Sequence, residues 1–148
     1  MRHLGIDYGT RRIGLALSDE GGRLATPLEV LQVTDPHQAV APISALVEAE
    51  QVAVLVVGLP LNMDDSVGPA ARAVREWGTG LSRTAGRPVV FVDERLSSFE
   101  AEQTLRQRKQ AGQRMTRQGR KQRLDAVAAA QLLQSYLDGV LKPLPDED

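Results

Sequence analysis

The first 14 residues, Met1–Gly14, read MRHLGIDYGTRRIG and contain the pattern that decides the fold. Two strand-forming runs separated by Gly9-Thr10 predict a β-hairpin at the N-terminus. Because side chains alternate along a strand, Gly5 and Asp7 should face the same side of the sheet. The small residue Gly14 on the second strand would let another element approach closely. The hairpin therefore predicts a carboxylate, Asp7, at the end of a closely packed strand.

Length and composition favour one soluble domain. A chain of 148 residues can bury about 70% of the surface that it exposes when unfolded. It has no cysteine, which excludes disulfides and thiolate metal sites. The longest apolar run, 52–61, is too short to cross a bilayer, and the N-terminus has no signal-peptide layout. We therefore expect a soluble, cytoplasmic protein with no membrane partner.

Positive charge is concentrated in one segment, although the formal net charge of the chain is only −1. Residues 106–123 hold eight of the 18 basic residues and no acidic residue, which leaves ten basic and 19 acidic residues elsewhere. The alternative is a solvated helix face, but this segment has no carboxylates to form i,i+4 pairs. The segment therefore favours a polyanion as partner. Its basic residues are Arg106, Arg108, Lys109, Arg114, Arg117, Arg120, Lys121 and Arg123.

The remaining patterns predict an α/β fold in the order β-β-β-α-β-α-β-α-α. A meander followed by β-α-β crossovers implies a mixed five-stranded sheet flanked by helices, and Pro27 suggests that the third strand is an edge strand. We expect residues 1–141 to form a single domain and residues 142–148, with two prolines and three acids, to form a short acidic tail. The expected strands after the hairpin are 23–33, 53–57 and 89–92, and the expected helices are 36–50, 69–85, 97–109 and one from 117 or 124 to 136 or 137.

Two carboxylates follow strands that should be parallel and close neighbours. Asp7 ends the first strand, and Glu94 comes just after the apolar run Val89–Val92. The carboxyl edge of such a sheet is where open α/β folds bind ligands. The adjacent Asp93 should point away from Glu94 in an extended segment, so we leave it out of the site. The alternative for Glu94 is an ordinary solvated loop residue.

Asp125 lies on an otherwise core-facing stripe of the last helix, with apolar or aromatic residues four, seven and 11 positions later. A carboxylate on such a stripe is costly unless it is paired or binds a metal. The alternative is that Asp125 caps a helix that begins at Ala126. Together with Asp7 and Glu94, and without histidine or cysteine partners, Asp125 would form a hard-oxygen site for Mg²⁺ or Mn²⁺.

Other residues are candidates for holding nucleic-acid phosphates. The loop Gly58–Asn62 would present backbone amides and the Asn62 side chain, although a plain strand-to-helix turn is an alternative. Arg11 and Arg12 follow Asp7 closely and either bind phosphates or stay solvated. The basic segment would hold the nucleic-acid backbone without reading its sequence. The candidates from that segment are Arg114, Arg117, Arg120, Lys121 and Arg123.

Four segments carry a resemblance to a known family. GIDYGTRRIG, VVGLPLNMD, VDERLSSFEAE and RLDAVAAAQLLQSYL occur in this order and resemble the signature blocks of the YqgF-type family. The resemblance covers essentially the whole chain, from Met1 to about Tyr136. Two positions depart from the pattern. Asp64-Asp65 stands where the family more often has Asp-Gly, and Ala128 stands where related resolvases commonly have a further acid.

The resemblance implies an RNase H-like fold and a metal-dependent endonuclease that hydrolyses phosphodiester bonds of structured nucleic acid. Members are described as Holliday junction resolvases or as pre-16S rRNA nucleases of ribosome biogenesis. Carried over by position, the family's catalytic acids fall on Asp7, Glu94 and Asp125, which would bind two divalent ions. Cleavage should leave a 5′-phosphate and a 3′-hydroxyl.

Two other function classes explain part of the pattern. ATPases and sugar kinases share the Asp-x-Gly-Thr turn, but they close two lobes over a nucleotide, and 148 residues leave no room for a second lobe. A non-catalytic nucleic-acid-binding factor of ribosome assembly would explain the basic segment, but not a carboxylate on the apolar stripe of the last helix. The sequence leaves open DNA or RNA as the substrate and a monomer or a homodimer as the active form.

Overall fold

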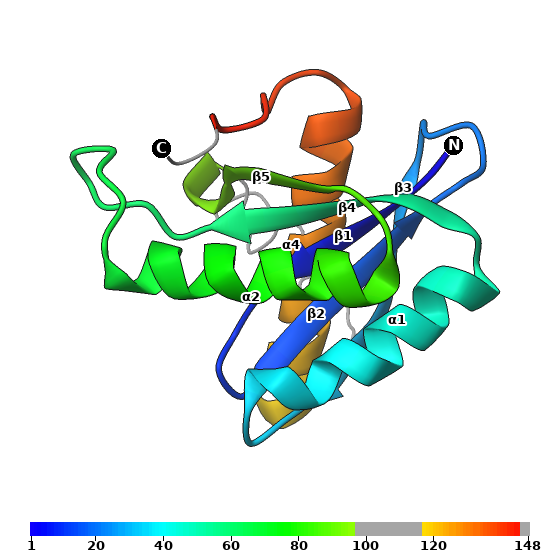
Figure 1. Cartoon of the computed structure of the whole chain (residues 1–148), viewed down its shortest axis with the longest axis horizontal. Coiled ribbons are helices and arrows are strands. Elements are labelled where there is room, and N and C mark those ends of the chain that lie inside the picture. Colours follow the sequence, from blue (N-terminus) through cyan, green and yellow to red (C-terminus); the bar gives the residue numbers. More distant parts are fainter. Residues whose placement is uncertain (97–116, 146–148) are drawn as a thin grey trace.

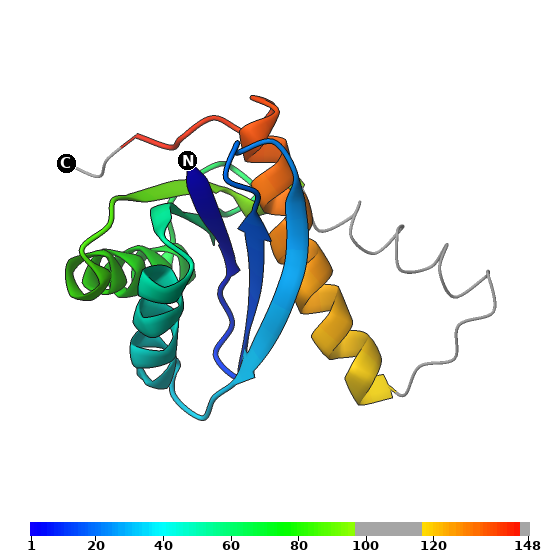
Figure 2. The same ribbon diagram turned by 90° about the vertical axis from the view of Figure 1, so that its right-hand side faces the viewer.

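A sheet separates two layers of helices in the computed structural model, which describes residues 1–96 and 117–145. Figure 2 shows α1 and α2 on one side of the sheet and α4 on the other. The strands are β1 (Arg2–Asp7), β2 (Arg12–Ser18), β3 (Ala25–Gln32), β4 (Val52–Leu59) and β5 (Val89–Asp93). The helices of the described residues are η1 (Pro36–Ala39), α1 (Val40–Ala49), α2 (Pro69–Ala85), η2 (Glu94–Leu96) and α4 (Arg117–Leu137), where η marks a 3-10 helix.

The sheet is mixed, with the strand order β3-β2-β1-β4-β5 (Figure 1). β1 pairs antiparallel with β2 and parallel with β4, and β5 is parallel to β4. Because β4 lies between β1 and β5, only one strand separates the two chain segments that carry Asp7 and Glu94. The predicted α/β class, the mixed five-stranded sheet and the edge position of the strand that contains Pro27 are confirmed.

One face of the sheet packs against α1 and α2. Leu4 and Ile6 of β1 lie in this core together with Trp77 and Leu81 of α2. The spacing of the buried residues of α2 places them on one side of that helix. The helix ends where Gly86 takes a left-handed φ of 69°, a conformation that glycine adopts without strain.

The opposite face packs against α4, and two glycines bring this helix close to the sheet. A Cβ at Gly5 would lie only 2.8 Å from the Cβ of Leu133 and 2.9 Å from the backbone oxygen of Ala129. A Cβ at Gly14 would overlap the backbone of Asp125. These contacts confirm that the second strand of the hairpin admits a closely approaching element. Since alternate residues of β1 share a face, α4 covers the side of β1 that bears both Gly5 and Asp7.

Helix boundaries differ from the expectations in one place and settle an alternative in another. After Asp35 the chain first forms η1, in which Asp35 and Gln38 make a capping box, and α1 begins only at Val40. Of the two predicted starts for the last helix, the structure has Arg117. The predicted helix 97–109 lies outside the described residues. No helix in the described parts of the chain is long and apolar enough to span a lipid bilayer.

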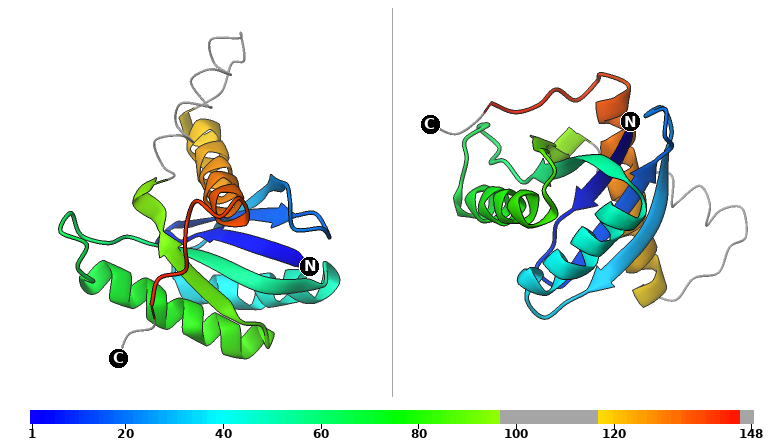
Figure 3. Two further views of the ribbon diagram at one scale, coloured as in Figure 1. Left: turned by 90° about the horizontal axis from the view of Figure 1, so that it is seen from above. Right: turned by 45° about the vertical axis from the view of Figure 1, so that its right-hand side comes forward.

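The chain beyond α4 crosses the outer edge of the sheet. Figure 3 shows this segment running past β5 towards α2. The Leu144 N–H donates to the Phe91 carbonyl oxygen at 2.7 Å, and Arg75 of α2 donates to the carbonyl oxygen of Pro145 at 3.3 Å. The described part of the expected tail, residues 142–145, therefore covers part of the β5 edge and satisfies one of its backbone groups.

Candidate active site

Asp7 ends β1 between two glycines of the neighbouring strands. Its partner on β2 is Gly14, and the preceding Ile6 pairs with Val57, the residue before Gly58 of β4. The missing side chains of Gly14 and Gly58 let other segments approach closely on both sides of Asp7, on the face that α4 covers. The strand register therefore allows other residues to pack closely around one carboxylate at the edge of the sheet.

Glu94 occupies the space over Gly58. A Cβ at Gly58 would lie 2.8 Å from the Cβ of Glu94 and 3.3 Å from Glu94 Oε2. The chain turns into η2 at Glu94, directly after β5, and this turn lays the side chain back across β4. The structure therefore places Glu94 at the same edge of the sheet as Asp7. Gly58 of β4 lies between the two strands that carry these acids.

Asp125 reaches this edge from α4. Because the helix begins at Arg117, Asp125 is an interior residue of the helix, and the alternative that it caps a helix from Ala126 is wrong. Its backbone packs on Gly14, the strand partner of Asp7. Its Oδ2 accepts a hydrogen bond from Arg12 Nε at 2.9 Å. The three predicted carboxylates thus come from β1, from the turn after β5, and from α4.

The carboxylates influence one another electrostatically. Burial, followed by the charges of Glu94 and Asp125, raises the pKa of Asp7 to about 8. Burial and the charge of Asp93 raise the pKa of Glu94 to about 7. Two carboxyl groups that keep protons near neutrality indicate a site with an excess of negative charge.

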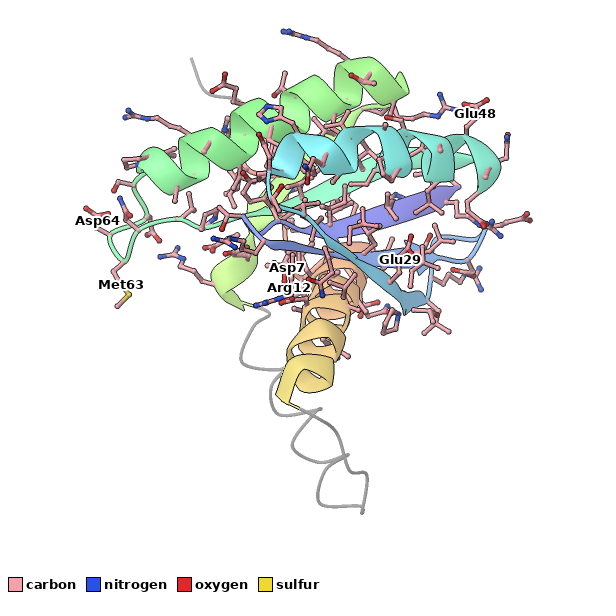
Figure 4. All side chains as sticks on the ribbon, turned by 90° about the horizontal axis from the view of Figure 1, so that it is seen from below. Asp7, Arg12, Glu29, Glu48, Met63 and Asp64 are labelled. Carbon is pink, nitrogen blue, oxygen red and sulfur yellow. The ribbon has the colours of Figure 1, made fainter. Side chains whose placement is uncertain are left out.

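A hollow of about 290 Å³, lined by residues 7–12 and Asp125, opens beside this edge. Figure 4 shows Asp7 and Arg12 together next to α4. Tyr8 packs edge-on against Trp77 of α2, with ring centroids 5.0 Å apart, so one side of its ring is held by the core. Among the side chains that the structure describes, no group of three acidic or histidine residues is already arranged to hold a metal ion.

Arg95 fastens the loop between β4 and α2 to the end of β5, next to Glu94. Its guanidinium donates to Asp93 Oδ2, to the Asn62 carbonyl oxygen and to Asp65 Oδ1, each at 2.6 Å. The hydrogen bonds from Arg95 lower the pKa of Asp93, and they hold the Asp93 carboxylate against the guanidinium. Asp93 stays outside the predicted site, whereas Arg95 is a residue of this region that the sequence did not predict. The available signal was a basic residue directly after the Asp93-Glu94 pair.

The structure explains why this chain can have Asp65 where the family more often has glycine. Asp65 has a φ of 67°, the left-handed conformation that glycine adopts most readily. A glycine there would relieve the backbone but could not bind Arg95. In this chain the carboxylate of Asp65 therefore offsets an unfavourable backbone conformation with an ion pair to Arg95.

The predicted phosphate-binding residues fall into three groups. Arg12 pairs with Asp125, and Arg11 is exposed at the rim of the hollow. The Asn62 side chain donates to Ser66 Oγ at 3.0 Å within its own loop. Arg114 lies outside the described residues. The structure describes only the backbone, and not the side chains, of the four candidates at the start of α4, which are Arg117, Arg120, Lys121 and Arg123.

Solved structures share this fold over nearly the whole chain. Thermus thermophilus RuvC in complex with a Holliday junction matches with a TM-score of 0.58 and 18% identity, covering 97% of this chain and 99% of that chain. The Fowlpox virus resolvase in complex with Holliday junction DNA matches with a TM-score of 0.55 and 10% identity, covering 96% of this chain and 100% of that chain. At these identities the likeness concerns the fold, and it confirms the predicted RNase H-like architecture.

Relatives match at much higher identity. A protein of Acidiphilium cryptum, provisionally named a pre-16S rRNA nuclease, is 42% identical over 146 residues, which are 99% of this chain and 89% of the relative. A protein of Anaeromyxobacter with the same name is 45% identical over 139 residues, which are 94% of this chain and 98% of the relative. The model of the family described as "RuvX: Holliday junction resolvase" matches residues 1–139, which confirms the YqgF-type resemblance. The chain belongs to the RuvX family of Holliday junction resolvases.

Proposed function

We propose that this nuclease cleaves phosphodiester bonds of structured nucleic acid at the edge formed by Asp7, Glu94 and Asp125. The observation that carries the proposal is the packing of Glu94 over Gly58 and of the Asp125 backbone over Gly14, so that both acids flank Asp7 and their charges raise its pKa. Clustered carboxylates are costly to a fold, as the raised pKa values of Asp7 and Glu94 indicate. A protein that only binds nucleic acid gains nothing from such a cluster.

The donor set fits Mg²⁺ or Mn²⁺, because both ions prefer carboxylate oxygens. Asp7, flanked by the other two acids, would be a ligand of the ions, and Glu94 and Asp125 would complete the ligands. Such ions supply Lewis-acid activation of water and offset the charge of the phosphate. Asp125 would offer the ion the same carboxylate that accepts a hydrogen bond from Arg12.

The other groups of the chain position the nucleic acid. Arg11 at the rim of the hollow and the basic segment 106–123 supply positive charge for backbone phosphates. Asn62 lies in a loop that Arg95 holds beside Glu94, close to the path of a strand that enters the site. In this proposal residues 1–141 act as a single nuclease domain, as a monomer or a homodimer. Charge and shape, rather than base contacts, would select the substrate.

Two substrates follow from the comparisons. The relatives are named for the precursor of 16S rRNA, and the family description names the Holliday junction. The proposal is tested by incubating the purified protein with a labelled rRNA precursor and a four-way DNA junction, side by side, in Mg²⁺, Mn²⁺ or EDTA. We expect cleavage of at least one substrate, only with metal, to leave a 5′-phosphate and a 3′-hydroxyl. Symmetric cuts in the junction would indicate a two-fold dimer.

Two results would count against the proposal. Cleavage in EDTA at the same rate as in Mg²⁺ or Mn²⁺ would show that the reaction does not depend on a metal. Tight binding of both substrates without cleavage under any metal condition would favour the alternative, a non-catalytic ribosome-assembly factor.

A further inference from the structure

The ion pair between Arg12 and Asp125 forms part of the wall of the proposed active site. The Arg12 side chain is 35% exposed and that of Asp125 is 25% exposed, with 2.9 Å between Nε and Oδ2. Both residues line the hollow that Asp7 also lines. Arg12 begins β2 directly after the turn, and its partial exposure lets the guanidinium move towards solvent without displacing the core.

A guanidinium and a divalent cation compete for the same carboxylate. Arg12 donates to Oδ2 of Asp125, one of the two oxygens with which this carboxylate could bind a metal ion, and its charge repels an ion held by Asp7. A guanidinium also binds phosphate well, because two phosphate oxygens can accept from its pair of parallel N–H donors. A metal ion on Asp125 and a phosphate on Arg12 therefore favour the same rearrangement, in which the ion pair opens.

We propose that Arg12 is a positioning residue that holds Asp125 until a nucleic-acid phosphate draws the guanidinium away, so that metal and nucleic acid bind cooperatively. This inference rests on the active site proposed above. Without nucleic acid, Arg12 keeps the affinity of the site for metal low. Because coupling between two ligands is reciprocal, the metal must raise the affinity for nucleic acid by the factor by which nucleic acid raises the affinity for metal.

The first test measures binding of Mg²⁺ alone, by calorimetry at pH 8, where protons compete less for the carboxylates. Arg12→Gln should bind Mg²⁺ about tenfold more tightly than the wild type, because a positive charge a few ångströms from the ion is removed. Arg12→Lys keeps the charge and should stay within about threefold of the wild type. Arg83→Gln removes the same charge from an exposed residue of α2 that does not line the hollow, and serves as the matched control, with a shift of less than about threefold.

The second test adds a short phosphorothioate duplex, which resists cleavage. The duplex should raise the Mg²⁺ affinity of the wild type at least about fivefold, and this coupling should shrink to less than half in Arg12→Gln. Thermal melting of each variant verifies that it is folded, and Arg12→Met, which also removes the charge and should show the same loss of coupling, replaces Arg12→Gln should that variant melt below the assay temperature.

The outcomes separate this inference from the proposed function. Wild-type or weaker Mg²⁺ affinity in folded Arg12→Gln, combined with loss of Mg²⁺ binding in Asp7→Asn, would overturn the role of Arg12 and leave the active site standing. Unchanged Mg²⁺ binding in Asp7→Asn as well would overturn both.

Discussion

Replacing Asp7 by asparagine should stabilise the metal-free protein at neutral pH. The pKa of Asp7 is raised from 3.8 to about 8 in the fold, so between these values the folded state binds a proton that the unfolded state releases. Stability therefore falls as the pH rises through this window, and the loss is complete above about pH 8. At about 1.4 kcal/mol per pKa unit, the ionisable group costs the fold about 4 kcal/mol at pH 7. Relaxation around the charge reduces this value, and we expect a gain of about 2–4 kcal/mol in Asp7→Asn.

The assay is urea unfolding of the wild type and Asp7→Asn in EDTA, at steps from pH 5 to pH 9. The difference in unfolding free energy should grow by up to about 1.4 kcal/mol per pH unit between pH 5 and pH 7 and level off above pH 8. At pH 7 the melting temperature should rise by at least about 4 °C. Glu29→Gln, which removes an exposed acid of β3, is the control and should change the unfolding free energy by less than about 0.5 kcal/mol. Equal stability of Asp7→Asn and the wild type across this range would refute the electrostatic description of the site.

Three further predictions concern the surroundings of the site. Replacing three basic residues of the segment 106–123 by alanine should weaken binding to unrelated sequences alike, and lower the log–log salt slope by roughly 0.7–0.9 per lost phosphate contact. These residues are Arg114, Arg117 and Lys121. Gly14→Ala should cost about 2 kcal/mol or more in urea unfolding, because its Cβ would meet the backbone of Asp125, whereas Gly80→Ala, with no atom within 4 Å, should gain about 0.5–1 kcal/mol. Asp65→Gly should relieve the left-handed backbone but remove the bond to Arg95, and should speed amide exchange in the loop between β4 and α2.

The sheet and two of the three acids could be predicted because their signals are local. Short apolar runs that end in turns define β1 and β5, and each run is followed at once by its carboxylate, Asp7 or Glu94. The alternation of side chains along β1 predicted the shared face of Gly5 and Asp7, and the contacts of Gly5 with α4 agree with it. Asp125 could be placed on a helix. Whether it caps that helix depends on where the helix begins, and the basic segment, which contains glycines, gives no clear start.

The contacts that complete the site could not be predicted, because they join distant segments. Arg12 and Asp125 are 113 positions apart in the chain, and no local pattern pairs a turn arginine with a helix acid. The bonds from Arg95 depend on the conformation of the loop after β4, including the positive φ of Asp65. The sequence shows that Gly58 lies near the end of a buried strand. That Glu94 packs over this glycine depends on the turn η2, which no local pattern predicts.

Asp7 should take part in the chemistry of cleavage and not in substrate binding. The direct measurement compares the wild type and Asp7→Asn on one labelled four-way junction and one rRNA precursor in Mg²⁺, recording the single-turnover cleavage rate and the Kd in the same preparations. On the substrate that the wild type cuts, the variant should cleave at least about a thousandfold more slowly, while its Kd stays within about threefold or improves. Cleavage by Asp7→Asn within tenfold of the wild type, in preparations free of contaminating nuclease, would contradict the account.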